Sequence, residues 1–177
     1  MDLSPSRYLG ALLRSTAVLA LVSLAILGGA AAASRSTPAC TTAKLVVWLN
    51  TESGGAAAGS TYYKLELTNL SGHACTLRGY PGVSAIDLGG RQLGSAAGRN
   101  PMRPARTITL APGAGAAAVL QIADAYNYPP ATCRRTTAAG LRVYPPDQTL
   151  ARTVPFPFGA CSRAGPVYLN VTRVQRA

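Results

Sequence analysis

The chain has 177 residues, enough for one domain with a hydrophobic core, and carries 17 basic against six acidic residues, a net charge of +11. A positive surface attracts polyanions, although a GC-rich genome also encodes arginine-rich, lysine-poor proteins. The arginines lie in no nucleic-acid-binding motif and are not interleaved with aromatic residues, which argues against specific nucleic-acid binding.

The first 33 residues have the organisation of a secretory signal peptide. Arg7 and Arg14 supply a positive n-region, residues 16–27 form an apolar run, and residues 28–33 are the small residues that a signal peptidase requires. This pattern predicts export with cleavage near Ala33. The mature protein is then secreted into the extracellular space or associated with the cell wall.

The folded domain is expected to begin near the first cysteine. We predict a short flexible segment over residues 34–39 and a single domain over residues 40–177. An uncleaved anchor is the alternative, because residues 16–33 reach the shortest length that spans a bilayer. A lipid anchor at Cys40 is disfavoured, because no leucine lies three residues upstream. Membrane contact is therefore expected only through the signal segment before cleavage.

A β-hairpin is predicted at the start of the domain. Residues 44–50 (KLVVWLN) are apolar and β-branched, residues 62–69 (YYKLELTN) alternate, and residues 51–61 form a glycine-rich loop. In an antiparallel hairpin, the residue numbers of any two facing residues add up to nearly the same value. A turn centred near residue 57 therefore places Cys40 opposite residue 74 or 75.

The stretch CTLRGYPGV, residues 75–83, is interpreted as a corner of the backbone. Gly79 and Gly82 permit a positive φ or a close approach, and the proline fixes its own φ. Tyr80 is expected to pack its ring into the corner and to bond its hydroxyl to nearby backbone. A ligand-contacting pair of Arg78 and Tyr80 is the functional alternative.

The middle of the chain alternates short strands with turns. Residues 83–88 and 91–93 flank a two-glycine turn, residues 94–104 form an irregular loop, and residues 107–110 and 116–122 are strands. This part also carries an acid-free run of arginines. If they share a face, they form an anion-binding patch of four residues: Arg91, Arg99, Arg103 and Arg106.

The last third of the chain continues the pattern. Residues 124–133 form a tyrosine- and proline-rich loop, and residues 141–143 and 153–154 are strands on either side of a proline turn. Residues 167–174 alternate and close the domain. Arg173 is expected near a frayed C-terminus.

All four cysteines lie after the signal peptide, so two disulfides are expected in an oxidising compartment. The proline turn, centred near residue 147, places Cys133 opposite Cys161, and the first hairpin pairs Cys40 with Cys75. Zinc is a poor alternative, because the chain has no C-x-x-C motif and its only histidine is His73.

About eight short strands, together with two disulfides, predict an all-β domain. The expected architecture is an antiparallel β-sandwich, immunoglobulin-like in a broad sense. A closed β-barrel is the alternative.

Seven motifs occur in this order: AAGSTYYKLELTNLSG, CTLRGYPGVSAID, RQLG, TLAPGAGAAAVL, NYPPATC, GLRVYPP and FPFGAC. Together they resemble, over about residues 40–174, the secreted actinobacterial family catalogued as domain of unknown function 4232. The resemblance implies export, one β-rich domain and paired cysteines. Many relatives look like lipoproteins, and this chain departs from them by lacking a lipobox. The family has no established activity, so the resemblance transfers no functional residue.

No motif assigns a catalytic residue, a cofactor or a metal site. His73 stands alone in a turn, and the G-x-S-x-G elbow, the Walker sequence, the G-x-G-x-x-G fingerprint and the calcium loop are all missing from the sequence. The five acidic residues after the signal peptide are far apart in sequence: Glu52, Glu66, Asp87, Asp124 and Asp147.

The biochemical function is not given by the sequence. We expect a non-enzymatic binding or structural module of the cell envelope, with an anionic envelope polymer or an extracellular protein as partner. A secreted enzyme of unrecognised type is one alternative, and it would need His73, a hydroxyl and an acid in one pocket. A secreted protein inhibitor is another, with residues 124–131 as the exposed loop.

Overall fold

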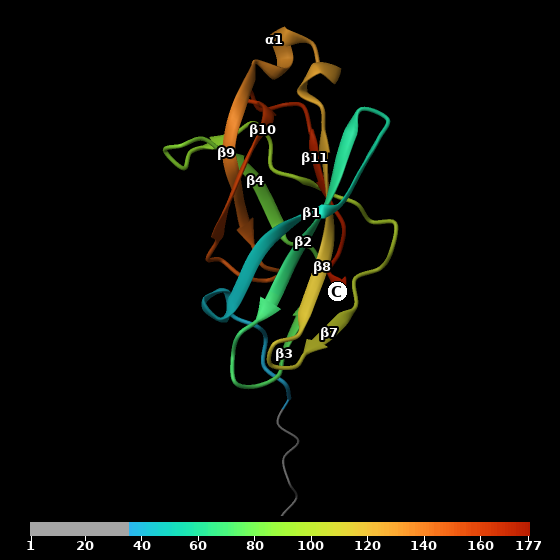
Figure 1. The fold of residues 1–177 in the computed structure, drawn as a ribbon, viewed down its shortest axis with the longest axis vertical. Coiled ribbons are helices and arrows are strands. Elements are labelled where there is room, and N and C mark those ends of the chain that lie inside the picture. The colour runs from blue at the N-terminus through green and yellow to red at the C-terminus, as the bar shows by residue number, and fades with distance from the viewer. Residues whose placement is uncertain (1–35) are drawn as a thin grey trace, which may run out of the picture. The chain divides into compact units, whose positions relative to one another are not determined.

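The computed structural model describes residues 36–177 (Figure 1). The predicted signal peptide and the first two residues of the predicted segment over residues 34–39 lie outside this part. Between residues 36 and 177, no helix is both long and apolar enough to cross a membrane.

Twelve strands make up most of the described chain. They are β1 (Leu45–Ala57), β2 (Ser60–Asn69), β3 (Cys75–Arg78), β4 (Gly82–Ile86), β5 (Gln92–Leu93), β6 (Gly98–Arg99), β7 (Thr107–Leu110), β8 (Gly115–Ala123), β9 (Arg135–Tyr144), β10 (Arg152–Cys161), β11 (Leu169–Val171) and β12 (Gln175–Arg176). Three one-turn helices join them: η1 (Thr42–Lys44), η2 (Ala125–Asn127) and α1 (Pro130–Cys133).

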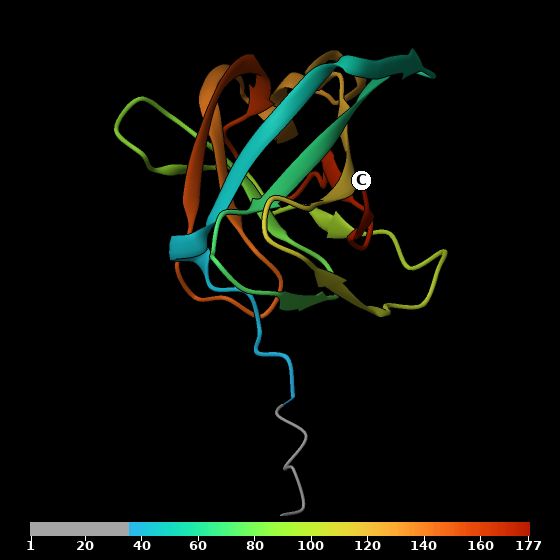
Figure 2. The same cartoon turned by 60° about the horizontal axis from the view of Figure 1, so that its bottom comes forward.

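The strands form two main sheets and a small third one. The larger sheet has the order β1-β2-β8-β11-β6, with β12 also paired to β8, and the second has the order β10-β9-β4-β5. Strands β3 and β7 pair with each other. The two main sheets pack face to face (Figures 1 and 2), which confirms the predicted β-sandwich. A closed barrel is wrong, because each sheet ends in edge strands.

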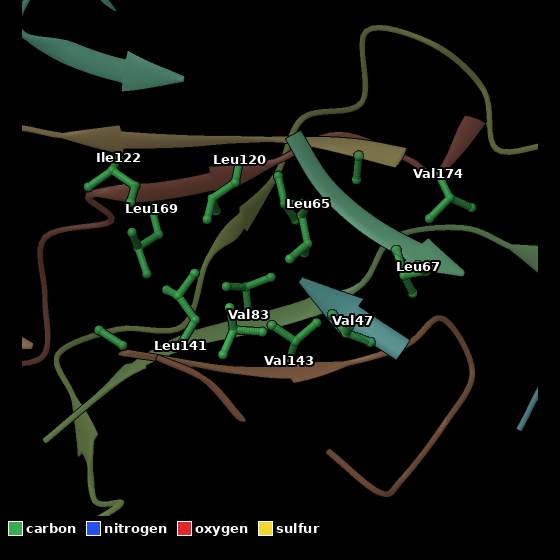
Figure 3. Packing of buried hydrophobic residues seen from close by; sticks show 14 of the residues in the cluster. Val47, Leu65, Leu67, Val83, Leu120, Ile122, Leu141, Val143, Leu169 and Val174 are labelled. Carbon is green, nitrogen blue, oxygen red and sulfur yellow. The ribbon is translucent and has the colours of Figure 1, made fainter. Parts of the chain in front are cut away.

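The hydrophobic core lies between the two main sheets (Figure 3). Leu65 and Leu120 point inward from the larger sheet, and Leu141 and Val143 point inward from the smaller one; all four side chains are fully buried. Burying one such side chain contributes about 1.5–3 kcal/mol relative to leaving it exposed. The alternation that predicted the strands therefore also sets which residues face outward.

The first hairpin is longer than predicted. Strand β1 continues through the supposed loop of residues 51–61 as far as Ala57, and its register shifts between Asn50 and Gly55. The turn is the pair Ala58 and Gly59, with φ of +49° and +68°. Two consecutive positive φ values make the type of two-residue turn that suits a twisted hairpin. The glycine-rich composition concealed this strand, because glycine and alanine favour strands weakly.

Both predicted disulfides are present, and one forms by a different geometry from that predicted. Cys161 ends β10 and pairs with Arg135, and Cys133 lies two residues before Arg135, at a Cα–Cα distance of 4.5 Å from Cys161. Cys40 and Cys75 lie 4.8 Å apart, but the chain at Ala39 runs parallel to the chain at Thr76. Cys75 belongs to β3, so this bond is not an extension of the first hairpin.

Three smaller expectations are corrected by hydrogen-bond patterns. The turn between β4 and β5 has three residues, 88–90, because Asp87 pairs with Arg91. The loop over residues 94–104 contains β6, which runs parallel to β11. Of the closing strand predicted over residues 167–174, only Leu169–Val171 form a strand, β11.

Candidate functional site

The corner after β3 has the structural role predicted for it, and it also positions two arginines. Gly79 has a φ of +101°. Tyr80 donates a hydrogen bond from its hydroxyl to the backbone oxygen of Arg103, at 3.4 Å, which is 23 residues away in sequence rather than nearby. The guanidinium carbon of Arg99 lies 5.8 Å from the centre of the Tyr80 ring, within the range of a cation–π contact. Arg78 is exposed at the end of β3.

The four arginines of the predicted patch do not share one face. Arg91 lies on the β4–β5 hairpin, which projects from the opposite side of the domain to the loop that carries Arg103 and Arg106 (Figures 1 and 2). Arg91 is also paired with Asp87 at 2.8 Å, and hydrogen bonds from the Arg91 backbone and side chain lower the pKa of that carboxyl. Arg91 is therefore separate from Arg99, Arg103 and Arg106.

Arg173 was not part of the predicted patch, but the structure gives it an unusual environment. Its side chain is half-buried, and its Nε is buried without a hydrogen-bond partner. Its Nη1 donates to the backbone oxygen of Val174 at 3.3 Å. Within residues 36–177, the ion pair of Arg91 with Asp87 is the only salt bridge, so Arg173 faces no carboxylate there.

The backbone around Arg173 is fixed on both sides, so the expectation of a frayed end is wrong. Thr172 donates its backbone N–H to the oxygen of Val119 at 2.9 Å and accepts the Val119 N–H on Oγ1 at 2.8 Å. Val174 is fully buried in the core (Figure 3) and donates its N–H to Gly79 at 2.9 Å. Arg173 is thus presented from a rigid segment.

Arg173 lines a cavity of about 300 Å³. Its walls are Asn100, Met102, Arg103, Val119, Thr172, Arg173 and Gln175. A second cavity, of about 40 Å³, shares Asn100, Val119 and Thr172 with the first and extends to Tyr62, Gln121 and Asn170. We call the two cavities together the groove. The groove lies on the outer face of the larger sheet, because Val119 and Gln121 alternate along β8 with the buried Leu120 and Ile122.

The charge around the groove is positive. Arg103 and Arg173 belong to its walls, and Lys64 lies on the neighbouring strand directly opposite Val119. Glu66 lies on the same face of β2 as Lys64, and its carboxylate accepts a hydrogen bond from Asn50 on β1, the side away from β8. The residues that line the groove include no acidic residue. The groove therefore favours an anion.

Amide side chains line the rest of the groove. Gln121 and Asn170 lie directly opposite each other on β8 and β11. Asn100 accepts the Met102 N–H on Oδ1 at 3.1 Å, which orients its amide group. Gly98 leaves room for Asn170, since a Cβ at position 98 would lie 2.6 Å from Asn170 Oδ1. These groups can donate and accept hydrogen bonds toward a bound molecule.

A larger cavity than the groove, of about 510 Å³, lies beside the tip of the first hairpin. Most of its lining residues are alanine, glycine, serine and threonine. Its one charged residue, Asp124, accepts a hydrogen bond from the Tyr126 N–H at 2.9 Å and so serves to cap η2. This cavity offers little chemistry for recognition.

His73, the histidine that a catalytic alternative would use, lies in the turn between β2 and β3. His73 is exposed, and the interactions at this residue are those of its carbonyl oxygen, which accepts from Asn69 Nδ2 at 3.0 Å and from Ser71 Oγ at 2.7 Å. Across residues 36–177, no three side chains of histidine, cysteine, aspartate or glutamate gather as metal ligands.

Residues 40–175 match the family model described as "Domain of unknown function (DUF4232)". The chain belongs to this family. The DUF4232 match contains all four cysteines and every residue that lines the groove. No curated protein and no solved structure matches the chain.

Proposed function

We propose that this protein is a non-enzymatic binding domain that takes an anionic ligand in the groove. The observation that carries the proposal is Arg173, a half-buried cation that lines the groove beside Arg103 and has no carboxylate partner within residues 36–177. A charge that is partly removed from water is normally paired with an opposite charge. An anion bound in the groove would supply that charge to the Arg173 guanidinium.

The composition of the groove supports binding rather than catalysis. Its walls carry arginine, amide, hydroxyl and apolar side chains, and no histidine, cysteine, aspartate or glutamate. General acid–base or nucleophilic catalysis needs a group that can accept and return a proton near neutral pH. Arginine remains protonated and instead holds carboxylate or phosphate oxygens.

The protein acts outside the cytoplasm, as a secreted or cell-wall-associated protein of actinobacterial type. Two disulfides fit an oxidising compartment. The signal-peptide pattern of residues 1–33 supports the same location. The intact mass of the exported protein tests this, because a product that retains residues 16–27 would contradict cleavage near Ala33.

A secreted inhibitor is a second candidate, favoured by the rigid exposed loop between β8 and β9. Tyr126 is 78% exposed, and the guanidinium carbon of Arg135 lies 4.5 Å from the centre of the Tyr126 ring. Arg135 also donates to the backbone oxygens of Ala125 and Tyr128, at 3.2 and 3.0 Å. Inhibition of an extracellular enzyme that is lost in Tyr126→Ala would establish this role.

The anion-binding proposal is tested by affinity for carboxymethyl-dextran from about 50 to about 500 mM salt, since exposed charges are screened within about 10 Å at 0.1 M. Arg173→Gln and Arg103→Gln should each weaken binding about tenfold. Arg134→Gln removes the same charge from an exposed position at the end of α1 and serves as the control. Equal weakening by all three variants would overturn the proposal and leave net charge as the explanation.

A further inference from the structure

We infer that the ligand of the groove is an acidic oligosaccharide, a sugar chain that carries carboxylates. This inference rests on the proposed function and adds the chemical class of the ligand. The groove has a cationic end at Arg103 and Arg173 and a neutral polar end at Tyr62, Gln121 and Asn170. The neutral end, of about 40 Å³, has room only for small polar groups, so a ligand that reaches both ends needs an anionic group and hydroxyl groups attached close to it.

The cationic end is suited to a carboxylate. Arg173 uses Nη1 for the backbone oxygen of Val174, and its Nε has no acceptor in the described chain. Its Nη2 makes no hydrogen bond within residues 36–177 and is not buried, so it can donate to a carboxylate oxygen in the groove, beside Arg103. The segment that carries Arg173 is rigid, so little conformational freedom is lost when a ligand binds.

The neutral end is suited to sugar hydroxyl groups. Each hydroxyl donates and accepts, and side-chain amides do the same. Gln121 is oriented by its own hydrogen bond, in which Nε2 donates to Ser60 Oγ at 3.0 Å, so its Oε1 is left as an acceptor. Tyr62, opposite Gln121 on β2, adds an aromatic ring with a polar tip.

The neutral end of the groove contains residue types that β-strands disfavour. Asparagine is depleted in strands, yet Asn170 occupies β11 between two neighbouring strands, and Gly98 is needed beside it to make room for the amide. Asn170 makes no side-chain hydrogen bond within residues 36–177 that would give it a structural role. A role in ligand recognition accounts for its presence.

Other anions match the groove less well. Phosphate or sulfate ions would use the two arginines and leave the amides without partners. Single-stranded nucleic acid is bound by several aromatic platforms, and Tyr62 is the aromatic residue in this groove. A lipid would require a mostly apolar lining, and the apolar residues of the groove are only Met102, Val119 and Val171.

The experiment measures the affinity of the exported protein by calorimetry for three kinds of probe. The first is a panel of uronic-acid oligosaccharides (oligogalacturonate, oligomannuronate and hyaluronan fragments), the second is a neutral oligosaccharide of matched length, and the third is inorganic polyphosphate. We expect the protein to bind at least one member of the uronic-acid panel at least about tenfold more tightly than the neutral sugar. Arg173→Gln should weaken binding of that sugar and of polyphosphate alike.

Two further variants separate this inference from the proposed function. Tyr62→Ala and Asn170→Ala should weaken binding of the acidic oligosaccharide about fivefold or more and leave polyphosphate binding unchanged, with Arg134→Gln as the charge control. If Arg173→Gln weakens polyphosphate binding but no acidic sugar binds, or neither further variant alters sugar binding, the anion site stands and the glycan inference is overturned. If Arg173→Gln affects no probe, the proposed function itself fails.

Discussion

Thr172 and Val119 are joined by two hydrogen bonds, one from the Thr172 N–H to the Val119 oxygen at 2.9 Å and one from the Val119 N–H to Thr172 Oγ1 at 2.8 Å. The threonine side chain thus takes the place of a backbone acceptor at the end of β11. Because Arg173 is the next residue, this pair of bonds sets where its guanidinium lies.

Thr172→Val removes the acceptor for the Val119 N–H and keeps the shape of the side chain. The free energy of unfolding should fall by about 1–3 kcal/mol, because a partly buried donor is left unpaired. Anion binding should weaken as well, because Arg173 loses its fixed neighbour. Denaturant unfolding and titration with carboxymethyl-dextran measure the two effects, and Thr137→Val on the exposed side of β9 is the control. Unchanged binding in Thr172→Val would show that Arg173 is held by other contacts.

Gly98→Ala should displace the Asn170 amide, since the new Cβ would lie 2.6 Å from Oδ1 and 3.0 Å from Val167 Cγ1. The clash is with the ends of two side chains that can rotate, so the loss of stability should be modest, about 1 kcal/mol. Affinity for the acidic oligosaccharide should fall about as much as in Asn170→Ala. Gly159→Ala, where a Cβ would meet nothing within 4 Å, is the matched control. Full affinity in Gly98→Ala would exclude Asn170 from recognition.

Tyr168 makes the stability sensitive to alkali. It is fully buried, and burial raises the pKa of its hydroxyl from 10.0 to about 12. The unfolded chain therefore loses this proton first, and the free energy of unfolding should fall between about pH 10 and pH 12, by at most about 3 kcal/mol. Tyr168→Phe should remove this part of the pH dependence, at the expense of the hydrogen bond to the Leu93 oxygen. Thermal unfolding between pH 9 and pH 12 measures it, and parallel curves for both proteins would contradict the assignment.

The disulfide between Cys133 and Cys161 should contribute substantially to stability. It closes a sequence separation of 28 residues, for which the chain-entropy model gives about 3–4 kcal/mol. The double variant Cys133→Ala/Cys161→Ala should lower the free energy of unfolding by that amount while keeping the fold. Non-reducing peptide mapping of the wild-type protein should recover Cys133 with Cys161 and Cys40 with Cys75, and any crossed pair would contradict this pairing.

The strands were predictable where apolar residues alternate, as in β2, and where turn residues mark their ends. The alternation also gave the inward face of the sheet, because it depends only on sequence spacing. The first half of the long hairpin was predicted and its second half was not. Residues 51–57 carry no apolar alternation, and their pairing follows from the turn at Gly59.

The groove could not be assembled from the sequence, because its residues come from segments that meet only through sheet order. Tyr62, Gln121 and Asn170 belong to three strands, and a parallel pairing of β6 with β11 brings Asn100 beside them. One signal was available: Gln121 is the only polar residue in the strand AAAVLQIA. Arg173 was overlooked, because position near the end of a chain says nothing about burial.

The bond between Cys40 and Cys75 also determines how the domain bears mechanical load. Strands β1 and β2 lie entirely within the covalent loop that it closes. Tension applied through the residues before Cys40 passes across the sulfur atoms into β3 and bypasses residues 41–74. Pulling on that end therefore cannot peel β1 away from β2, and the force falls instead on the pairing of β3 with β7 and on the strands beyond it.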